Sequence, residues 1–318
     1  MRKVRIGLVQ TRWEGKITDE KTIRTNIEKM IQKHEAYTET AAKEGAHILC
    51  FQELFFGPYF CAEQKSHWYN FAEPIPGPIS NRMSHLAKKH KIILIVPMYE
   101  EEMKGVYYNT AIVIDQDGQM LGKYRKTHIP LIESVTGQNV YEKFYFRPGN
   151  LGFPVFHTPF GVKFGIIVCY DRHFAETGRM VALGGAEVLF VPSATAGVTT
   201  RLWEVELQFH AITNAMFVCG VNRVNKDAGT LESRKHFGGT VAIDSRGEIP
   251  DRCLRCRFPP ANGSGGDCCR GYIVSAHWAC SGTNLAEVLR VAIGYLRLPA
   301  RQYISPSFQS PRPLDLRV

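Results

Sequence analysis

The stretch Val162-Lys-Phe-Gly-Ile-Ile-Val-Cys169, followed by Tyr-Asp-Arg-His173, decides the fold. Its first part is a short apolar run rich in β-branched and aromatic residues, which is typical of a buried strand. The strand is predicted to end on Cys169, and polar residues follow at once. Reactive side chains of α/β proteins gather where a strand ends and the chain turns into a helix. The stretch therefore predicts an α/β fold and a candidate nucleophile, Cys169.

A single cysteine in this position has an ordinary alternative, since buried and inert cysteines are common. Cys50 and Cys219 lie inside apolar runs, and we interpret both in that way. Cys169 differs because backbone amides of a following turn would form an oxyanion hole and lower the pKa of the thiol.

Strand-like and helix-like segments alternate on both sides of this stretch, from the N-terminus to about residue 249. The turn Gln-Asp-Gly118 between two apolar runs indicates a hairpin, and Gly45 closes the first helix. We expect strands at 4–10, 47–51, 92–97, 109–115, 119–123, 188–191 and 217–221, and helices at 21–43, 81–90, 179–183 and 202–215. Buried strands mixed with covering helices predict a layered α/β sandwich.

Glu53 is the second candidate, in Phe51-Gln-Glu-Leu-Phe55 at the end of a predicted strand. Aromatic surroundings raise the pKa of a carboxyl group toward the range that suits a general base. The alternative is a solvated residue at a strand terminus, which the flanking phenylalanines disfavour.

Lys126 is the third candidate, in the run Lys123-Tyr-Arg-Lys-Thr-His128. Such a run is usually a basic surface patch. A catalytic interpretation needs one cation to stabilise an oxyanion, and spacing alone does not select among the three basic residues Lys123, Arg125 and Lys126.

Composition excludes several classes of protein. The chain of 318 residues is 44% hydrophobic and 22% charged, which is typical of a globular protein. Its net charge of +9 comes from scattered residues without a nucleic-acid-binding motif, so we expect no nucleic-acid partner. The sequence has no apolar run of about 20 residues, so we expect no membrane span. The N-terminus resembles a strand rather than a signal peptide, which favours the cytoplasm, and the odd number of nine cysteines argues against a complete disulfide framework.

The stretch 250–318 differs in composition from 1–249, and we interpret it as a divergent tail, incomplete or disordered. It contains no lysine, holds five of the nine cysteines, and offers one amphipathic helix at 284–298. A shifted reading frame or an alternative exon is one hypothesis for this change. Zinc ligands are a weaker alternative to leftover thiols, because the spacing of Cys253, Cys256, Cys268, Cys269, His277 and Cys280 is irregular.

Four motifs together resemble those of the carbon–nitrogen hydrolase (nitrilase) superfamily. They are Phe51-Gln-Glu-Leu-Phe55, Tyr124-Arg-Lys-Thr-His-Ile-Pro130, Glu142-Lys-Phe-Tyr-Phe-Arg-Pro-Gly149 and Cys169-Tyr-Asp-Arg-His-Phe174. The resemblance extends over 1–249 and is greatest to the N-carbamoyl amide hydrolase branch, which includes β-ureidopropionase and N-carbamoylputrescine amidase. It implies a four-layer α-β-β-α sandwich of the nitrilase type and a homo-oligomer.

The resemblance also implies roles for individual residues. Glu53, Lys126 and Cys169 match the catalytic triad of the family, and Glu142 matches a second glutamate of the carbamoylase branch. His128 and Arg172 match positions that line the substrate pocket, with Arg172 expected to bind a substrate carboxylate. In the implied mechanism the backbone amide of Tyr170 shares the oxyanion with Lys126.

The implied reaction hydrolyses a small N-carbamoyl compound, best matched by N-carbamoyl-β-alanine, to an amine, carbon dioxide and ammonia. It needs no metal or organic cofactor. A plain amidase or nitrilase is the alternative within this class, and a catalytically impaired product with an altered C-terminus is the alternative outside it.

Three departures from the family pattern are present. The segment 131–141 before Glu142 is longer than usual, and Ala175 stands where the family usually has proline. The family's closing strands are not recognisable in 250–318. We therefore expect an exposed sheet edge, with lower activity and stability than the resemblance suggests.

Overall fold

The computed structural model describes residues 2–133, 139–225, 236–249, 253–254 and 270–278. All of them lie in one compact unit, residues 1–280. The predicted helix at 284–298 and most of the cysteine-rich tail lie outside the described residues.

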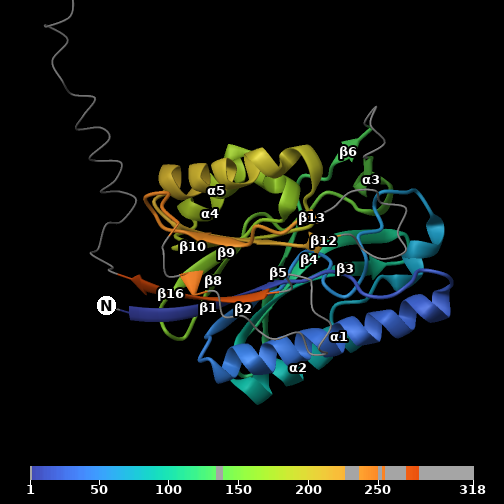
Figure 1. Cartoon of the computed structure of the whole chain (residues 1–318), viewed down its shortest axis with the longest axis horizontal. Coiled ribbons are helices and arrows are strands. Elements are labelled where there is room, and N and C mark those ends of the chain that lie inside the picture. Colours follow the sequence, from blue (N-terminus) through green and yellow to red (C-terminus); the bar gives the residue numbers. More distant parts are fainter. Residues whose placement is uncertain (1, 134–138, 226–235, 250–252, 255–269, 279–318) are drawn as a thin grey trace, which may run out of the picture. The chain divides into compact units, whose positions relative to one another are not determined.

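The first sheet has seven strands in the order β15-β16-β1-β2-β3-β4-β5 (Figure 1). β1, β2 and β3 are parallel, and β4 and β5 continue the sheet as antiparallel hairpins. The strands are β1 (Arg2–Gln10), β2 (Ile48–Cys50), β3 (Ile93–Met103), β4 (Val106–Ile114), β5 (Met120–Arg125), β15 (Cys253–Leu254) and β16 (Arg270–Trp278).

The second sheet has five strands in the order β14-β11-β10-β9-β8. They are β8 (Val155–His157), β9 (Lys163–Ile166), β10 (Val188–Ser193), β11 (Phe217–Asn222) and β14 (Val241–Ile243). Two further pairs are small: β6 (Leu131–Ile132) with β7 (Val140–Tyr141), and β12 (Val224–Asn225) with β13 (His236–Phe237).

The helices begin and end where local chemistry requires. The longer ones are α1 (Glu20–Lys43), α2 (Pro78–His90), α4 (Ala175–Leu183) and α5 (Thr200–Asn214), and the short ones are α3 (Glu142–Tyr145), η1 (Ser66–Phe71), η2 (Cys169–His173) and η3 (Gly197–Thr199). The Asp19 carboxylate caps α1 by accepting from the backbone N–H of Thr22 at 2.8 Å. Pro78 occupies the first turn of α2, where its missing N–H costs nothing.

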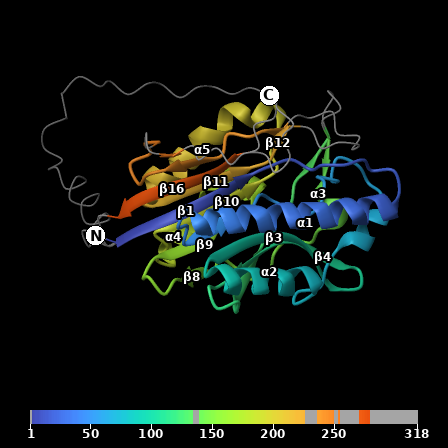
Figure 2. The ribbon, with the colours of Figure 1, turned by 60° about the horizontal axis from the view of Figure 1, so that its bottom comes forward.

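The strand period of two divides the core into three apolar layers, which fixes the architecture. On β3, Ile93 and Ile95 face the second sheet, whereas Leu94 and Val96 face α1 and α2. On β10, residues 188 and 190 face the first sheet, and residues 189 and 191 face α4 and α5. Two helix layers thus enclose two sheets, and the expected α-β-β-α sandwich is confirmed (Figures 1 and 2).

Several boundaries differ from those predicted. The strand before the candidate nucleophile ends at Ile166, and Cys169 begins η2 instead of ending the strand. β3 continues to Met103 because β4 pairs along its whole length. β8 and β14 are edge strands of only three residues, which is too short for a periodic pattern to reveal.

The tail supplies a strand that the sequence did not predict. β16 pairs antiparallel with β1 over nine residues, from Arg2↔Trp278 to Gln10↔Arg270, and β15 pairs with β16 (Figure 2). The edge of β1 is therefore covered, and the expectation of a bare edge there was wrong. The boundary at residue 249 stays a prediction.

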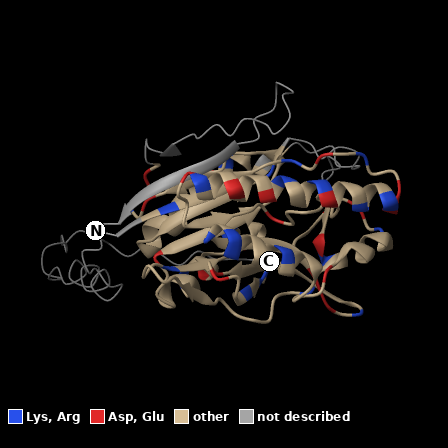
Figure 3. Ribbon diagram, turned by 90° about the horizontal axis from the view of Figure 1, so that it is seen from below, with Lys and Arg blue, Asp and Glu red and all other residues tan. Residues whose placement is uncertain are grey.

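Lys, Arg and Glu residues are interspersed along α1 (Figure 3). Arg82 of α2 joins this helix through ion pairs to Glu28 and Glu35, at 2.8 and 2.5 Å. Among the described residues, no helix combines the length and the apolar character that crossing a membrane requires.

Candidate active site

Glu53 lies in a strained turn directly after β2. The next residue, Leu54, has a φ of 51°, in the left-handed region that β- and γ-branched residues rarely adopt. The guanidinium of Arg223, which is fully buried, holds this turn by donating to the carbonyls of Glu53 (3.1 Å), Leu54 (2.6 Å) and Gly57 (2.7 Å). A single planar cation thus binds three backbone acceptors, and the Leu54 carbonyl also accepts from the backbone N–H of Gly57 at 3.2 Å.

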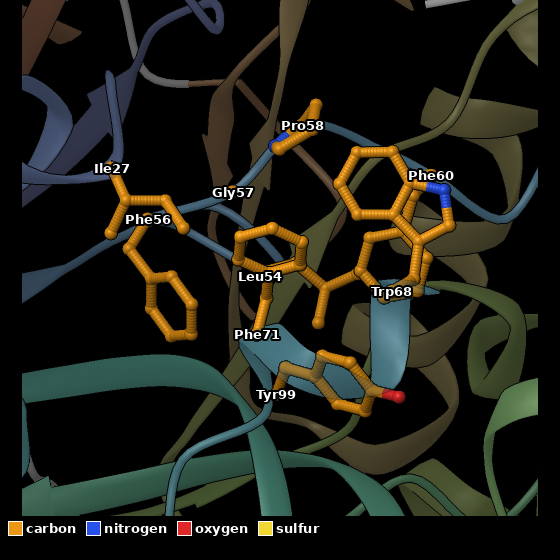
Figure 4. A pocket seen from close by; sticks show the side chains of 9 residues that line it. All are labelled: Ile27, Leu54, Phe56, Gly57, Pro58, Phe60, Trp68, Phe71 and Tyr99. Atoms are coloured by element: carbon orange, nitrogen blue, oxygen red, sulfur yellow. The ribbon is translucent and has the colours of Figure 1, made fainter. Parts of the chain in front are cut away.

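The outer side of the same turn packs against apolar and aromatic side chains (Figure 4). They leave a cavity of about 10 Å³, room for about one water molecule, which an apolar lining keeps dry. The lining residues are Ile27, Leu54, Phe56, Gly57, Pro58, Phe60, Trp68, Phe71 and Tyr99. The side chains that line this cavity pack behind Glu53 and support its turn. The cavity itself is too small and too apolar to hold a carbamoyl substrate.

Lys126 joins two carboxylates at the centre of the site. Its Nζ lies 2.8 Å from Glu53 Oε1 and 2.7 Å from Glu142 Oε2, and all three side chains are at most 1% exposed. Asn109 Nδ2 donates to Glu53 Oε1 at 2.7 Å, and the hydroxyl of Tyr59 donates to Glu142 Oε1 at 2.9 Å. Glu142 begins α3, so the long segment before it does not displace it from the site.

The ion pairs set the protonation of these groups. Burial alone would raise the pKa of Glu53, but the charge and hydrogen bond of Lys126 lower it below the usual value. The expectation of a raised pKa for Glu53 was therefore wrong in direction, because the cation outweighs the aromatic surroundings. Burial raises the pKa of Glu142 and the nearby Glu53 charge adds to this effect. Burial would lower the pKa of Lys126, yet both carboxylates raise it well above the usual range.

Cys169 is the first residue of η2 and has a φ of 48°. Burial, followed by the charge of Glu53, raises the pKa of its thiol to about 12, against the opposing charges of Lys126 and Arg172. The expected lowering of this pKa was wrong, since desolvation exceeds the effect of the turn. The resting thiol is neutral, and a base must remove its proton during attack. Glu53 is suited to that task because its carboxylate is buried and a side-chain hydrogen bond links it to Cys169.

Arg172 lies next to the nucleophile but is already paired. Its Nη1 donates to the carbonyl of Cys169 at 2.8 Å and lies 3.9 Å from the sulfur. Its Nε lies 2.9 Å from Glu206 Oε2 of α5, and the side chain is 1% exposed. This placement favours a role in holding Cys169, and the expected pairing of Arg172 with a substrate carboxylate stays a prediction.

The two remaining candidates lie near the nucleophile. His128 stacks on Phe174, with ring centroids 3.8 Å apart, and its Nδ1 lies 2.9 Å from Asp171 Oδ1. Tyr170 packs its ring against His173 and Phe174. The structure therefore brings Glu53, Lys126, Glu142 and Cys169 into one buried group, with the other three candidates beside it.

Sequence reasoning missed five residues of this site: Tyr59, Asn109, Asp171, Glu206 and Arg223. Arg223 and Asp171 each carried a signal, since a charged residue directly after a buried apolar run needs a buried partner. Asn109 and Tyr59 gave none, because their partners lie far away along the chain.

Within the described residues, no group of three or more histidine, cysteine or acidic side chains could hold a metal ion. The hypothesis of a zinc site in the tail is not tested, because Cys256, Cys268, Cys269 and Cys280 lie outside the described residues, as do the side chains of Cys253 and His277.

Comparisons with known proteins agree with this geometry. Residues 5–253 match the family model described as Carbon-nitrogen hydrolase. An N-carbamoylputrescine amidase of Solanum lycopersicum is 40% identical over 201 residues, 61% of this chain and 65% of that protein. A beta-ureidopropionase of Arabidopsis thaliana is 34% identical over 229 residues, 71% of this chain and 54% of that protein.

A solved structure extends the likeness to the fold. The carbon-nitrogen hydrolase from Helicobacter pylori G27 is 30% identical with a TM-score of 0.68, covering 78% of this chain and 84% of that one. The chain spans 65% and 54% of the two curated relatives. The family model covers most of the described residues, including Glu53, Lys126, Glu142 and Cys169. This chain belongs to the carbon-nitrogen hydrolase family.

Proposed function

We propose that this site hydrolyses the C–N bond of a small N-carbamoyl compound through a covalent intermediate on Cys169. The observation that carries the proposal is the buried Lys126 between Glu53 and Glu142, next to a thiol with a raised pKa. The names of the relatives, an N-carbamoylputrescine amidase and a beta-ureidopropionase, support the substrate class.

In the proposed first half-reaction, Glu53 removes the proton of Cys169 as the sulfur attacks the ureido carbon. Lys126 and the backbone amide of Tyr170 stabilise the oxyanion. When the tetrahedral intermediate collapses, the C–N bond breaks and ammonia leaves with the proton that Glu53 took up, with Glu142 as the alternative donor. A thiocarbamate remains on Cys169.

In the second half-reaction, water attacks the thiocarbamate with Glu53 as general base. The C–S bond breaks, the proton returns to the sulfur, and the resulting carbamate decomposes to the amine and carbon dioxide. One substrate and one water thus give one amine, one carbon dioxide and one ammonia. The residues described here carry all of these steps.

N-carbamoyl-β-alanine remains the proposed substrate, and N-carbamoylputrescine is the alternative with a cationic far end. The preference for N-carbamoyl-β-alanine comes from Arg172 as the expected partner of its carboxylate. The guanidinium of Arg172 is also paired with Glu206. Incubation with each compound, with ammonia and carbon dioxide measured together, separates these cases. Ammonia from a simple amide without carbon dioxide would instead establish an amidase or nitrilase.

The test of the site is a covalent adduct. Mass spectrometry of the intact protein and of its peptides after incubation with substrate and acid quench should find the adduct on Cys169. Cys169→Ala should show no adduct and no ammonia release, with an unchanged circular dichroism spectrum. Cys219→Ala is the matched control, because Cys219 is buried in the same apolar cluster as Cys169 but lies inside strand β11. An impaired protein would form no adduct, and ammonia release by Cys169→Ala would refute the nucleophile.

We also propose a homo-oligomer in the cytoplasm. Large apolar side chains exposed on α4 and α5 support self-association: Met180, Leu183, Val205, Phe209 and Ile212. Light scattering after size exclusion measures the number of subunits, and cell fractionation tests the compartment.

A further inference from the structure

The carboxylate of Asp171 closes the turn that carries the nucleophile. Its Oδ2 accepts from the backbone N–H of Val168 at 2.9 Å, and the backbone N–H of Asp171 donates to the carbonyl of Val168 at 3.0 Å. Cys169 lies inside this closed turn with its φ of 48°. A left-handed non-glycine residue persists only where its surroundings hold it. Asp171 supplies two of the bonds that do so.

The same carboxylate also holds the segment that carries the catalytic lysine. Oδ2 accepts from the hydroxyl of Tyr124 at 2.7 Å. Oδ1 accepts from the backbone N–H of His128 at 2.8 Å and contacts His128 Nδ1 at 2.9 Å. Lys126 lies between these two residues, and its own N–H donates to the carbonyl of Asn109 at 2.9 Å.

The two anchored segments belong to different sheets. Lys126 follows β5 of the first sheet, and Cys169 follows β9 of the second. Asp171 is 0% exposed and accepts hydrogen bonds from both sides. A carboxylate with all of its acceptor positions occupied has one stable orientation.

We infer that Asp171 is a positioning residue that ties the turn of Cys169 to the segment of Lys126 across the two sheets. It touches neither substrate nor reacting atoms and acts through the distance between sulfur and ammonium. The kinetic test of this inference rests on the proposed function, whereas a test by alkylation of Cys169 does not.

The test is Asp171→Asn, which keeps the shape of the side chain. The amide nitrogen is a donor and replaces one of the two oxygens, so whichever way the amide turns, either Val168 N–H or His128 N–H loses its acceptor. Because a small misplacement of reacting groups costs on the order of 100-fold in rate, kcat should fall by about that factor, with KM nearly unchanged. A two-fold effect or less on kcat would overturn the inference.

Two further variants separate positioning from stability. Tyr124→Phe removes one hydrogen bond and should lower kcat less than Asp171→Asn does, without unfolding the protein; an unchanged kcat would count against the tie even if Asp171→Asn fails to fold. Asp244→Asn is the matched control, since its carboxylate also accepts backbone N–H groups, from Arg246 and Glu248 at 2.9 Å, but lies in the turn after β14. It should leave kcat unchanged.

The chemical arm needs no substrate. The alkylation rate of Cys169 by iodoacetamide, followed by peptide mass spectrometry, reports the environment of the thiol directly. Asp171→Asn should change this rate and its pH dependence, whereas Asp244→Asn should not. If the unaltered protein hydrolyses no carbamoyl compound, the proposed function fails, but equal alkylation of Asp171→Asn and the unaltered protein is what would refute the tie.

Discussion

Lys126 is the residue on which the protonation of the site depends. Its single positive charge lies within hydrogen-bond distance of two carboxyl groups, so neither acid is buried without a cation. A buried charge pair that loses one member leaves the other uncompensated, which is costly. The catalytic and structural roles of Lys126 are therefore inseparable in a single substitution.

Glu53→Gln and Lys126→Met should each lower kcat by orders of magnitude, and the double variant should lower it little further. The reason is that base, cation and thiol act in one transition state. The measurement is ammonia release by the four proteins of the double-mutant cycle, with circular dichroism of each. If the loss of kcat in the double variant equals the product of the two single losses, the two residues act in separate steps.

The acid limb of kcat/KM should have its midpoint below pH 4.5, the usual value for a glutamate. The pKa of Glu53 is lowered, so the carboxylate stays ionised until the pH falls through that lowered value, and only then is the base lost. The same shift stabilises the fold above the usual pKa and ceases to do so as the pH falls through the lowered one. The measurement is the pH dependence of kcat/KM. Glu142→Gln should keep the acid limb at the same pH but with a lower overall rate. A midpoint above pH 4.5 in both proteins would contradict the assignment to Glu53.

At the scale of elements, the site consists of two short turns, one after β2 and one after β9. Each contains a non-glycine residue with positive φ, Leu54 and Cys169. Each is held by a buried charged side chain that bonds to backbone, Arg223 in the first and Asp171 in the second. Loops that carry reactive groups need such support, because connecting segments are otherwise the mobile parts of a fold.

Arg223→Met should lower kcat by on the order of 100-fold through the turn after β2, because three carbonyls lose their bond to the guanidinium and Glu53 is no longer fixed. Arg223→Lys is the graded control: it keeps the charge but replaces the planar fork with a compact ammonium, so it should restore activity only in part. The melting temperature should fall with kcat in both. Full activity in Arg223→Met would mean that packing alone holds the turn.

The sequence predicted the central elements because each buries one face, and burial leaves a periodic record. It proposed Glu53 and Cys169 from their places at the ends of predicted strands, whereas Lys126 was chosen from three basic residues only by the family resemblance. It did not predict the direction of the pKa changes of Glu53 and Cys169, because these depend on distances between residues from different elements. For the same reason it could not show that Arg172 faces Glu206, or that β16 pairs with β1.

At the scale of the whole molecule, the edge of the first sheet depends on the tail. Val274 of β16 pairs with Ile6 of β1 on one side and with Cys253 of β15 on the other. Val274→Pro should therefore destabilise the protein, because the strand has a neighbour on each side and proline lacks the N–H that a ladder needs. One lost hydrogen bond of about 1 kcal/mol lowers the melting temperature by about 2–4 °C in a domain of this size.

Thermal unfolding measures this effect, with Val274→Ala as the control that keeps the N–H. Hydrogen exchange of the β1 amides should accelerate in Val274→Pro alone. Equal melting temperatures in the two variants would show that β16 adds nothing to the stability of the sheet.

The layer of side chains between the two sheets has a kinetic meaning. Glu53 follows a strand of one sheet and Cys169 follows a strand of the other. The apolar side chains packed between the sheets, which include Ile95 and Phe190, therefore set the distance over which the proton is transferred. A change of one methyl group in this layer alters the gap that the proton must cross. Residues with no chemical function thus hold part of the control over rate, and variants with altered turnover are to be sought in the hydrocarbon interior as well as around the sulfur.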